Sequence, residues 1–269
     1  METASDPQYA AILDGESRQR RRNAVEVGAV LITVLVAAWY VDLFDFKRLW
    51  EGLPDMGSLF LEMLPPDFSN WKEWVKPLID TLGMSIGGTA LALVFSVLIG
   101  FCAAQNTTPH PVVYQIARAI LSLTRAVPEL ILGIVLVAAV GFGALPGALA
   151  LGIHSIGMVG KFFAESIEHV DPRPVEAVES TGANRLQTII HGYLPQVIPQ
   201  MADTAFYRWE YNFRASTLLG IVGAGGIGFQ LIGALRILRY DEMFAIILVI
   251  LAMVMIVDAT GAQLRRRFK

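Results

Sequence analysis

The chain has 269 residues, of which 54% are hydrophobic and 17% are charged, and its formal net charge is −3. Soluble domains carry roughly a quarter charged residues, so this composition argues against an ordinary soluble protein. The apolar residues gather in runs long enough to cross a bilayer, which takes about 20 residues. We therefore predict an all-α polytopic membrane protein. The single cysteine, Cys102, excludes an internal disulfide framework and a cysteine-based metal cluster.

The hydropathy pattern predicts about six membrane-spanning helices. A polar tail at residues 1–23 precedes the first span at 24–41, and a segment at 42–76 that is rich in Trp, Pro and acidic residues follows it. Residues 77–264 form the predicted core, and residues 265–269 form a basic tail. The five further spans are expected at about 78–104, 112–140, 148–167, 194–221 and 243–262.

The distribution of arginine predicts the orientation of the chain. Excess Lys and Arg marks the cytoplasmic side of a membrane, and arginines gather at 18–22 and 265–267, just outside the first and last spans. Both termini are therefore expected in the cytoplasm, in agreement with an even number of spans. Counting through the spans places 170–193 in the cytoplasm, whereas 42–76 and 223–240 face outward.

A polar, helix-forming segment separates two apolar blocks at 172–193. Pro172 and Pro174 suit the first turn of a helix. Apolar or small residues then recur every three or four positions, which is typical of one helix face. A glycine inside a helix costs about 1 kcal/mol relative to alanine, so Gly182 predicts a turn between two short helices. Taken alone, such an amphipathic segment is also compatible with a helix that lies on the membrane surface.

The spacing in this segment resembles the EAA loop of ABC importer permeases, in which E-A-A, a glycine and a Leu-Pro pair follow one another at fixed distances. Val178 replaces the third small residue of the motif. Gly192 stands where the family has Ile or Val, which predicts a looser start of the fifth span. The resemblance implies a type I ABC importer permease fold in which this loop is the coupling helix that docks on a cytoplasmic ATPase. The residues expected to couple to the ATPase are Glu176, Ala177, Gly182, Ala183, Leu194 and Pro195.

Three further stretches are similar to the permease of phosphonate importers: LPPDFSNW at 64–71, STGAN at 180–184 and GIVGAGGIG at 220–228. This resemblance implies a homodimer in the bacterial inner membrane, two cytoplasmic ATPase subunits, and a periplasmic binding protein that delivers phosphonate or a related phosphorus oxyanion. ATP and Mg would be held by the ATPase, and this chain is expected to bind no cofactor, metal ion or nucleic acid. The choice among phosphonate, phosphate, phosphite and a phosphonate ester stays open.

Charged residues inside membrane spans are costly and usually face protein or water. Arg125 lies four residues before Glu129, and Glu210 lies four residues before Arg214, so each pair is expected to meet on one helix face. Such pairs can fix helix packing, but arginine forks also suit the oxygens of a small phosphorus anion in a pathway. Both interpretations stay open for six residues: Arg125, Glu129, His154, Arg208, Glu210 and Arg214.

No stretch matches the phosphate-binding loop G-x-x-x-x-G-K-[ST], so the energy for transport is expected from another chain, and no catalytic residue is predicted. GAGGIG at 223–228 follows no strand, which favours a sharp outer turn over a dinucleotide site. The alternatives are a permease for another small solute, a proton-coupled secondary transporter and an intramembrane enzyme. The sequence has no evident internal repeat of the kind common in secondary transporters, and no H-E-x-x-H or G-x-S-x-G motif.

Overall fold

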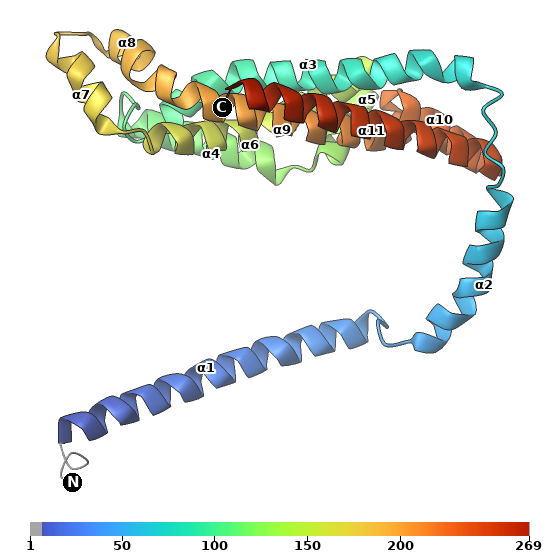
Figure 1. Ribbon diagram of the computed structural model, residues 1–269, viewed down its shortest axis with the longest axis horizontal. Helices are drawn as coiled ribbons and strands as arrows, with labels where there is room; N and C mark the ends of the chain where they lie inside the picture. The colour runs from blue at the N-terminus through green and yellow to red at the C-terminus, as the bar shows by residue number, and fades with distance from the viewer. Residues whose placement is uncertain (1–6, 269) are drawn as a thin grey trace. The chain divides into compact units, whose positions relative to one another are not determined.

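The computed structural model describes residues 7–268, and every regular element in that range is a helix (Figure 1). The chain divides into two compact units, Met1–Leu61 and Glu62–Lys269. Within the described range, four helices are long and apolar enough to cross a membrane, and six spans result if each of two bent helix pairs counts as one. The predicted all-α fold with about six spans is therefore confirmed.

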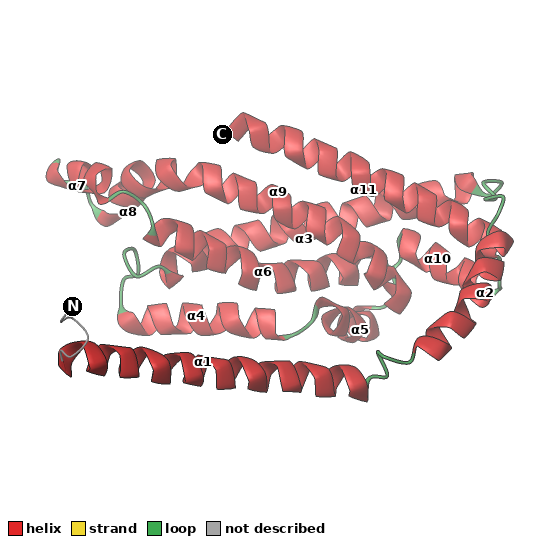
Figure 2. Ribbon diagram, turned by 60° about the horizontal axis from the view of Figure 1, so that its bottom comes forward, coloured by secondary structure: helices red, strands yellow, loops and turns green. Residues whose placement is uncertain are grey.

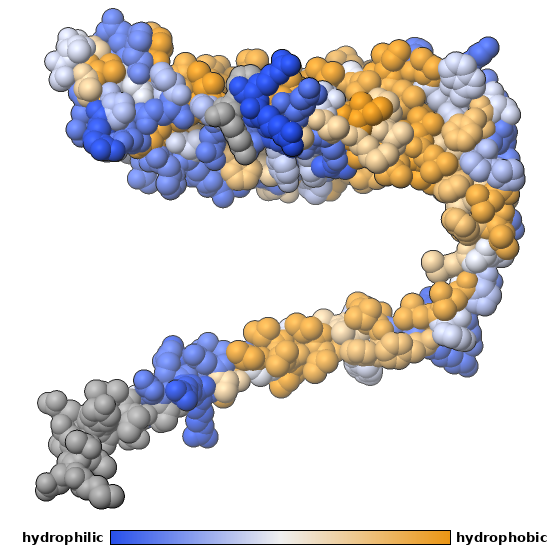
Figure 3. Space-filling view, viewed as in Figure 1, coloured by the Kyte–Doolittle hydropathy of each residue, from blue (hydrophilic) through white to orange (hydrophobic). Residues whose placement is uncertain are grey.

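The first unit consists of a long apolar helix and a shorter amphipathic one. Helix α1, Pro7–Tyr40, contains the apolar stretch Arg18–Tyr40 and ends close to the predicted end of the first span. Figure 3 shows apolar side chains along the second half of this helix. No side chain of α2, Phe46–Glu62, is buried. The apolar residues of α2 recur at helical spacing, at Phe46, Leu49, Trp50 and Leu53.

The second unit is a bundle of helices that run back and forth (Figure 2). π-helical turns at Ile189–Tyr193 and Gly220–Ala224 precede and extend its helix α9. Predicted spans at 148–167, 194–221 and 243–262 correspond to α6, α9 and α11, whereas α3 begins earlier than residue 78. The helices are α3 (Trp71–Ala103), α4 (Pro111–Ala126), α5 (Glu129–Val140), α6 (Ala144–Glu168), α7 (Pro172–Ser180), α8 (Arg185–Thr188), α9 (Leu194–Leu219), α10 (Ile227–Arg236) and α11 (Tyr240–Phe268).

The apolar region predicted as a span at 112–140 is a broken helix. Helices α4 and α5 meet at an angle of 85°. The residue before a proline avoids the helical conformation, and Val127 before Pro128 is extended, with φ −93° and ψ 118°. Proline also lacks the amide hydrogen that would continue α4. Pro128 therefore ends α4, and a new helix starts at Glu129.

The centre of the bundle is the close packing of α3 against α6. A Cβ atom added at Gly88 would lie 2.8 Å from Leu151 Cβ and 2.9 Å from the carbonyl oxygen of Ala148. Ala92, one turn further along α3, is fully buried. Helix association inside a bilayer depends on van der Waals packing, which small residues improve by letting backbones approach. The small residues at both positions therefore let α3 and α6 pack closely.

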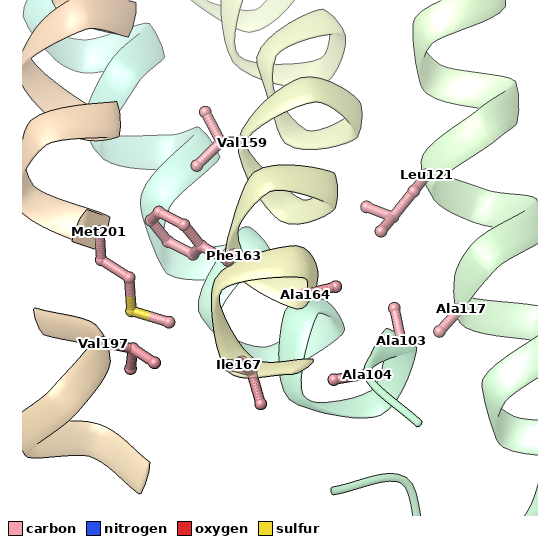
Figure 4. Packing of buried hydrophobic residues seen from close by; sticks show 10 residues of the cluster. All are labelled: Ala103, Ala104, Ala117, Leu121, Val159, Phe163, Ala164, Ile167, Val197 and Met201. Atoms are coloured by element: carbon pink, nitrogen blue, oxygen red, sulfur yellow. The ribbon is translucent and has the colours of Figure 1, made fainter. Parts of the chain in front are cut away.

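A second packing centre joins four helices near one end of the bundle (Figure 4). Phe163 of α6 points towards Val197 and Met201 of α9, and Leu121 of α4 faces α6 from the other side. Each large side chain contributes many weak dispersion contacts, which together hold the helices in register. The remaining buried members of this cluster are Ala103, Ala104, Ala117, Val159, Ala164 and Ile167.

The turns of the second unit gather at two opposite ends. At one end, Asn106 Nδ2 donates to the carbonyl of Ile167 over 2.6 Å, which joins the α3–α4 turn to the end of α6. At the other end, the amide of Gly143 donates to the carbonyl of Gly223 over 3.3 Å, which joins the α5–α6 turn to the turn after α9. The spans therefore alternate in direction, as the hydropathy pattern predicts.

The GAGGIG stretch forms the sharp turn that the sequence predicts. Gly223, Gly225 and Gly226 have φ angles of 95°, 77° and 72°, a region that glycine adopts readily and other residues avoid. Helix α10 follows directly after the turn. The turn therefore bends the chain by 59° between α9 and α10, where a dinucleotide loop would instead follow a strand.

The contact at Gly88 can be tested by adding a single methyl group. We expect Gly88→Ala to lower the free energy of unfolding by about 1–3 kcal/mol, because the methyl group meets the α6 backbone and Leu151. The matched control is Gly83→Ala on the same helix, where no atom lies within 4 Å. It should be neutral or stabilising by up to about 1 kcal/mol. Thermal unfolding of the purified chain in detergent measures both, and equal effects would contradict close packing at Gly88.

Candidate functional site

The loop between α6 and α9 begins with a well-formed helix start. Asp171 is the N-cap residue of α7, and its Oδ1 accepts a hydrogen bond from the backbone amide of Arg173 over 3.0 Å. The Arg173 side chain also donates to this carboxylate, and both hydrogen bonds lower the pKa of Asp171. Pro172 occupies the first helical position, where a missing amide hydrogen costs nothing. The cap therefore fixes where α7 starts.

Gly182 forms the turn between α7 and α8 that the sequence predicts. Its φ is 82°, and a Cβ atom there would meet nothing within 4 Å. Its need for glycine therefore lies in the backbone conformation and not in close packing. Helix α8 starts with a capping box, in which the side chains of Asn184 and Gln187 bind each other's backbone amides. The two short helices and the bend between them are confirmed.

The loop is attached to the bundle at several points. Val175 of α7 is 5% exposed, and a Cβ atom at Gly192 would lie 3.2 Å from its Cα. Gly192 was expected to loosen the start of the fifth span, but it lets α7 pack against the π-helical turn. The Gln196 side chain accepts from the amide of Asp171 over 3.1 Å, and Arg185 donates to the carbonyl of Thr107. A displacement of the loop must therefore move α9 as well.

The outer face of the loop is open to solvent. Glu176, Ala177 and Gly182 are exposed and Ala183 is half-buried. Helices α7 and α8 surround an open hollow of about 600 Å³. Three of the six predicted coupling residues line this hollow, whereas Leu194 and Pro195 lie outside it, at the start of α9. The hollow is lined by Ala177, Val178, Thr181, Gly182, Ala183, Gln187 and His191.

The prediction that Arg125 pairs with Glu129 is wrong. Glu129 accepts a hydrogen bond from Tyr211 Oη over 2.9 Å and lies 3.5 Å from His154 Nε2. Arg125 instead donates from Nε to the carbonyl of Leu121 over 3.1 Å. The break at residues 127–128 turns α5 away from α4, so the four-residue spacing no longer places the two side chains on one face. Glu129 and His154 are thus brought together from different helices.

The prediction that Glu210 pairs with Arg214 is also wrong, because each of them binds a residue of α11. Glu210 Oε1 accepts from Arg265 over 2.6 Å, and Arg214 Nη1 donates to Asp258 Oδ1 over 2.9 Å. A Cβ atom at Gly261 would lie 2.0 Å from Glu210 Oε1, so a side chain at residue 261 would displace this carboxylate. These two ion pairs connect α9 to α11 and assign Glu210 and Arg214 to helix packing.

Arg208 differs from the other intramembrane charges. It is 2% exposed, its Nε donates to Ser155 Oγ over 2.8 Å, and its Nη1 lies 3.0 Å from the sulfur of Met158. The guanidinium carbon lies 4.3 Å from the centre of the Tyr211 ring. Nη2 is buried and has no hydrogen-bond partner. Among the described residues, no carboxylate forms an ion pair with Arg208.

The sequence did not indicate three polar residues that are connected to Arg208 by hydrogen bonds, namely Ser155, Asn212 and Thr89. Asn212 accepts a hydrogen bond from Ser155 Oγ over 3.1 Å and donates to Thr89 Oγ1 over 2.9 Å, which joins α9 to α6 and α3. Uncharged polar residues in an apolar span give little signal by themselves. The three-residue spacing of Arg208 and Tyr211 is compatible with a shared helix face, but it does not reveal which other helices contribute.

Comparisons with known proteins agree with this architecture. Residues 96–269 match the family described as binding-protein-dependent transport system inner membrane component. The phosphite transport system permease protein PtxC of Stutzerimonas stutzeri is 60% identical over 92% of this chain and 90% of its own length. The phosphate-import permease protein PhnE of Mycolicibacterium smegmatis is 42% identical over 86% of this chain and 43% of its own length.

Solved structures confirm the predicted fold. A chain of the MetNI methionine ABC transporter, in an inward-facing conformation, superposes with a TM-score of 0.64 and 19% identity, over 72% of this chain and 95% of that one. A chain of an amino acid ABC transporter gives a TM-score of 0.62 with 18% identity, over 76% of this chain and all of that one. The likeness supports the type I ABC importer permease fold and carries no information on substrate.

The ion pair between Glu210 and Arg265 yields a testable consequence. Glu210 is 7% exposed, and removing the partner of a buried charge costs roughly 3–5 kcal/mol. We therefore expect Arg265→Gln to lower the thermal stability of the purified chain strongly and Glu210→Gln in the same chain to restore most of it. Arg214→Gln serves as the control, because Arg214 binds Asp258 and should not be rescued by Glu210→Gln. Rescue of Arg214→Gln in place of Arg265→Gln would contradict the observed pairing.

Proposed function

The chain belongs to the family of binding-protein-dependent transport system inner membrane components, and we propose that it is the membrane subunit of an ATP-driven importer of a phosphorus oxyanion. The observation that carries the substrate class is the 60% identity, over nearly the whole chain, to a phosphite transport permease. A relative at 42% identity is a phosphate-import permease. Phosphite is therefore the first substrate to test, followed by phosphate and phosphonates.

The loop of α7 and α8 is proposed to be the coupling element. It exposes Glu176, its Ala177 and Gly182 line an open hollow, and its inner face is fixed to α9. The loop would thereby transmit movement of a cytoplasmic ATPase to the helices that line the pathway. Ala183, Leu194 and Pro195 would support the contact or connect it to α9. ATP and Mg would bind to two copies of the ATPase and not to this chain.

Two further partners are proposed, a second copy of the chain and a periplasmic binding protein. Tyr207 of α9 is 49% exposed beside the buried Arg208, and the Glu129–His154 pair is partly exposed as well. Partly exposed polar groups in a bilayer usually face protein or water, which favours a second copy of the chain across the pathway. A periplasmic binding protein would meet the opposite end of the bundle, where the turn at 223–226 and α10 lie.

The proposed orientation places α7 and α8 in the cytoplasm of a bacterium and the chain in its inner membrane. Arginines at 18–22 and 265–267 would then lie on the cytoplasmic side, together with both termini. The α3–α4 turn lies at the same end as α7 and α8, because Arg185 binds Thr107. The turn at 141–143 and the GAGGIG turn would face the periplasm.

The transport assay tests the proposed function directly. The chain, its ATPase and its binding protein are reconstituted in vesicles with ATP on the ATPase side and labelled phosphite on the binding-protein side. We expect uptake that requires ATP and the binding protein, because no phosphate-binding loop occurs in this chain. Phosphate and methylphosphonate are tested in parallel. Uptake driven by a proton gradient without ATP would contradict the proposal and would favour a secondary transporter.

The coupling loop makes a separate prediction about the ATPase. We expect Gly182→Val to reduce co-purification of the ATPase and ATP hydrolysis stimulated by the binding protein, because its φ of 82° disfavours a branched side chain. Glu176→Ala should have a similar but weaker effect, since it removes one exposed charge. The matched control is Glu73→Ala, which changes an exposed glutamate in the first turn of α3, at the opposite end of the bundle. Full ATPase association by Gly182→Val would count against coupling through this loop.

A further inference from the structure

Arg208 forms no ion pair within the described part of the chain, and its Nη2 has no hydrogen-bond partner. A guanidinium does not give up its proton in proteins, and a buried charge is costly unless it is paired and hydrogen-bonded. The nearest candidate, Glu129, is already bound by Tyr211 Oη and lies beside His154. The other carboxylates that contact an arginine in the described spans pair with arginines other than Arg208. Glu129 therefore acts on Arg208 only through space, and no carboxylate binds the guanidinium directly.

The two nitrogens of Arg208 without a strong acceptor, Nη1 and Nη2, form one edge of the guanidinium. Nε is held by Ser155 Oγ, and one face of the guanidinium is covered by the Tyr211 ring. Nη1 faces the sulfur of Met158, which is only a weak acceptor. Nη2 has no partner at all. Two neighbouring nitrogens of a guanidinium match two oxygens of a phosphorus oxyanion in a bidentate arrangement.

A polar face of α9 connects Arg208 with one end of the bundle. Thr204, Gln200 and Gln196 precede Arg208 at successive four-residue intervals, and all three line a cavity of about 300 Å³ between α6 and α9. Twelve residues of helix correspond to about 18 Å. The cavity also includes Asp171, so it lies at the end that carries α7. The cavity reaches Thr204 but not Arg208, so an anion that leaves Arg208 would enter it about one helical turn further along α9.

We propose that the Nη1–Nη2 edge of Arg208 is a transient binding site for the transported phosphorus oxyanion. The proposal rests on the proposed function and adds the residue that recognises the anion inside the membrane. Ser155 and Tyr211 act as positioning residues, since they hold the guanidinium from the opposite edge and from one face. The weak Met158 contact is replaced when the anion arrives, which allows binding and release without breaking a strong ion pair.

A carboxylate from a second copy of the chain is the competing source of the missing charge. The two sources respond differently to lysine, because lysine keeps the positive charge but loses the two-nitrogen fork. An ion pair between copies tolerates Arg208→Lys, and Arg208→Gln then weakens assembly. Bidentate recognition of an oxyanion does not tolerate Arg208→Lys, although assembly persists. The lysine variant therefore separates the two explanations.

The experiment measures phosphite uptake by the complete complex in vesicles, together with ATP hydrolysis and thermal stability. For Arg208→Lys we expect uptake to fall at least about tenfold, the effect of one lost hydrogen bond to a charged group. ATP hydrolysis stimulated by the binding protein and the unfolding temperature should stay close to wild type. Arg214→Lys is the matched control on the same helix, and it should keep wild-type uptake because Arg214 binds Asp258.

Each outcome decides a different claim. Wild-type uptake by Arg208→Lys overturns the oxyanion site while leaving the importer function intact. Loss of assembly in Arg208→Gln together with full activity of Arg208→Lys also overturns it, in favour of an ion pair between copies. Absence of uptake of phosphite, phosphate and methylphosphonate by the wild-type complex overturns the proposed function itself. Loss of uptake in Arg208→Lys with retained stability and ATP hydrolysis supports the proposal.

Discussion

The constraint that shapes the second unit is that charged groups in a bilayer must find partners inside the protein. Glu210 and Arg214 of α9 meet this requirement through Arg265 and Asp258 of α11. Glu129 does so through Tyr211 and His154. These contacts determine which helices can lie beside α9 and at what rotation. Arg208 differs from them, because it is buried, forms no ion pair among the described residues, and has an Nη2 without a hydrogen-bond partner.

The loop of α7 and α8 and the polar groups around Arg208 are both connected to helix α9. Gln196 and Gly192 attach α7 to the start of this helix, and Arg208 lies near its middle. A rigid helix transmits displacement along its length, so a movement of α7 that displaces α9 also changes the surroundings of Arg208. The cavity between α6 and α9 includes Asp171 and Gln196 at the loop end and reaches Thr204, about one helical turn before Arg208. The proposed function thus requires one mechanical element and not a chain of separate movements.

Much of this architecture could be predicted from the sequence. Hydropathy indicates the number of spans, because the bilayer requires long apolar helices. The spacing around Gly182 predicts two short helices, since glycine favours a turn there. Pro128 predicts the bend between α4 and α5 because proline cannot continue a helix. In each case the determining interaction is local or is made with the membrane, so a single stretch of sequence carries the information.

The ion pairs could not be predicted in this way. Four-residue spacing favours a pair on one helix, but Glu210 and Arg214 bind residues of α11 that lie 55 and 44 positions further along the chain. The contact of Gly192 with Val175 and the room that Gly261 leaves for Glu210 likewise depend on how helices pack. The unpartnered edge of Arg208 can be recognised only once its neighbours are known. Tertiary contacts, and not local propensity, therefore define the candidate pathway.

The most direct measurement of the central claim is site-specific cross-linking from α7 in intact membranes. Cys102 is the single cysteine, so Ala177→Cys in a Cys102→Ala background carries one reactive thiol on the exposed face of the loop. A photoactivatable maleimide at this position should yield a covalent adduct with the ATPase subunit, and a membrane-impermeant thiol reagent added outside intact cells should not reach it. Labelling of residue 177 from outside the cell, or the absence of any ATPase adduct in an actively transporting complex, would contradict the account.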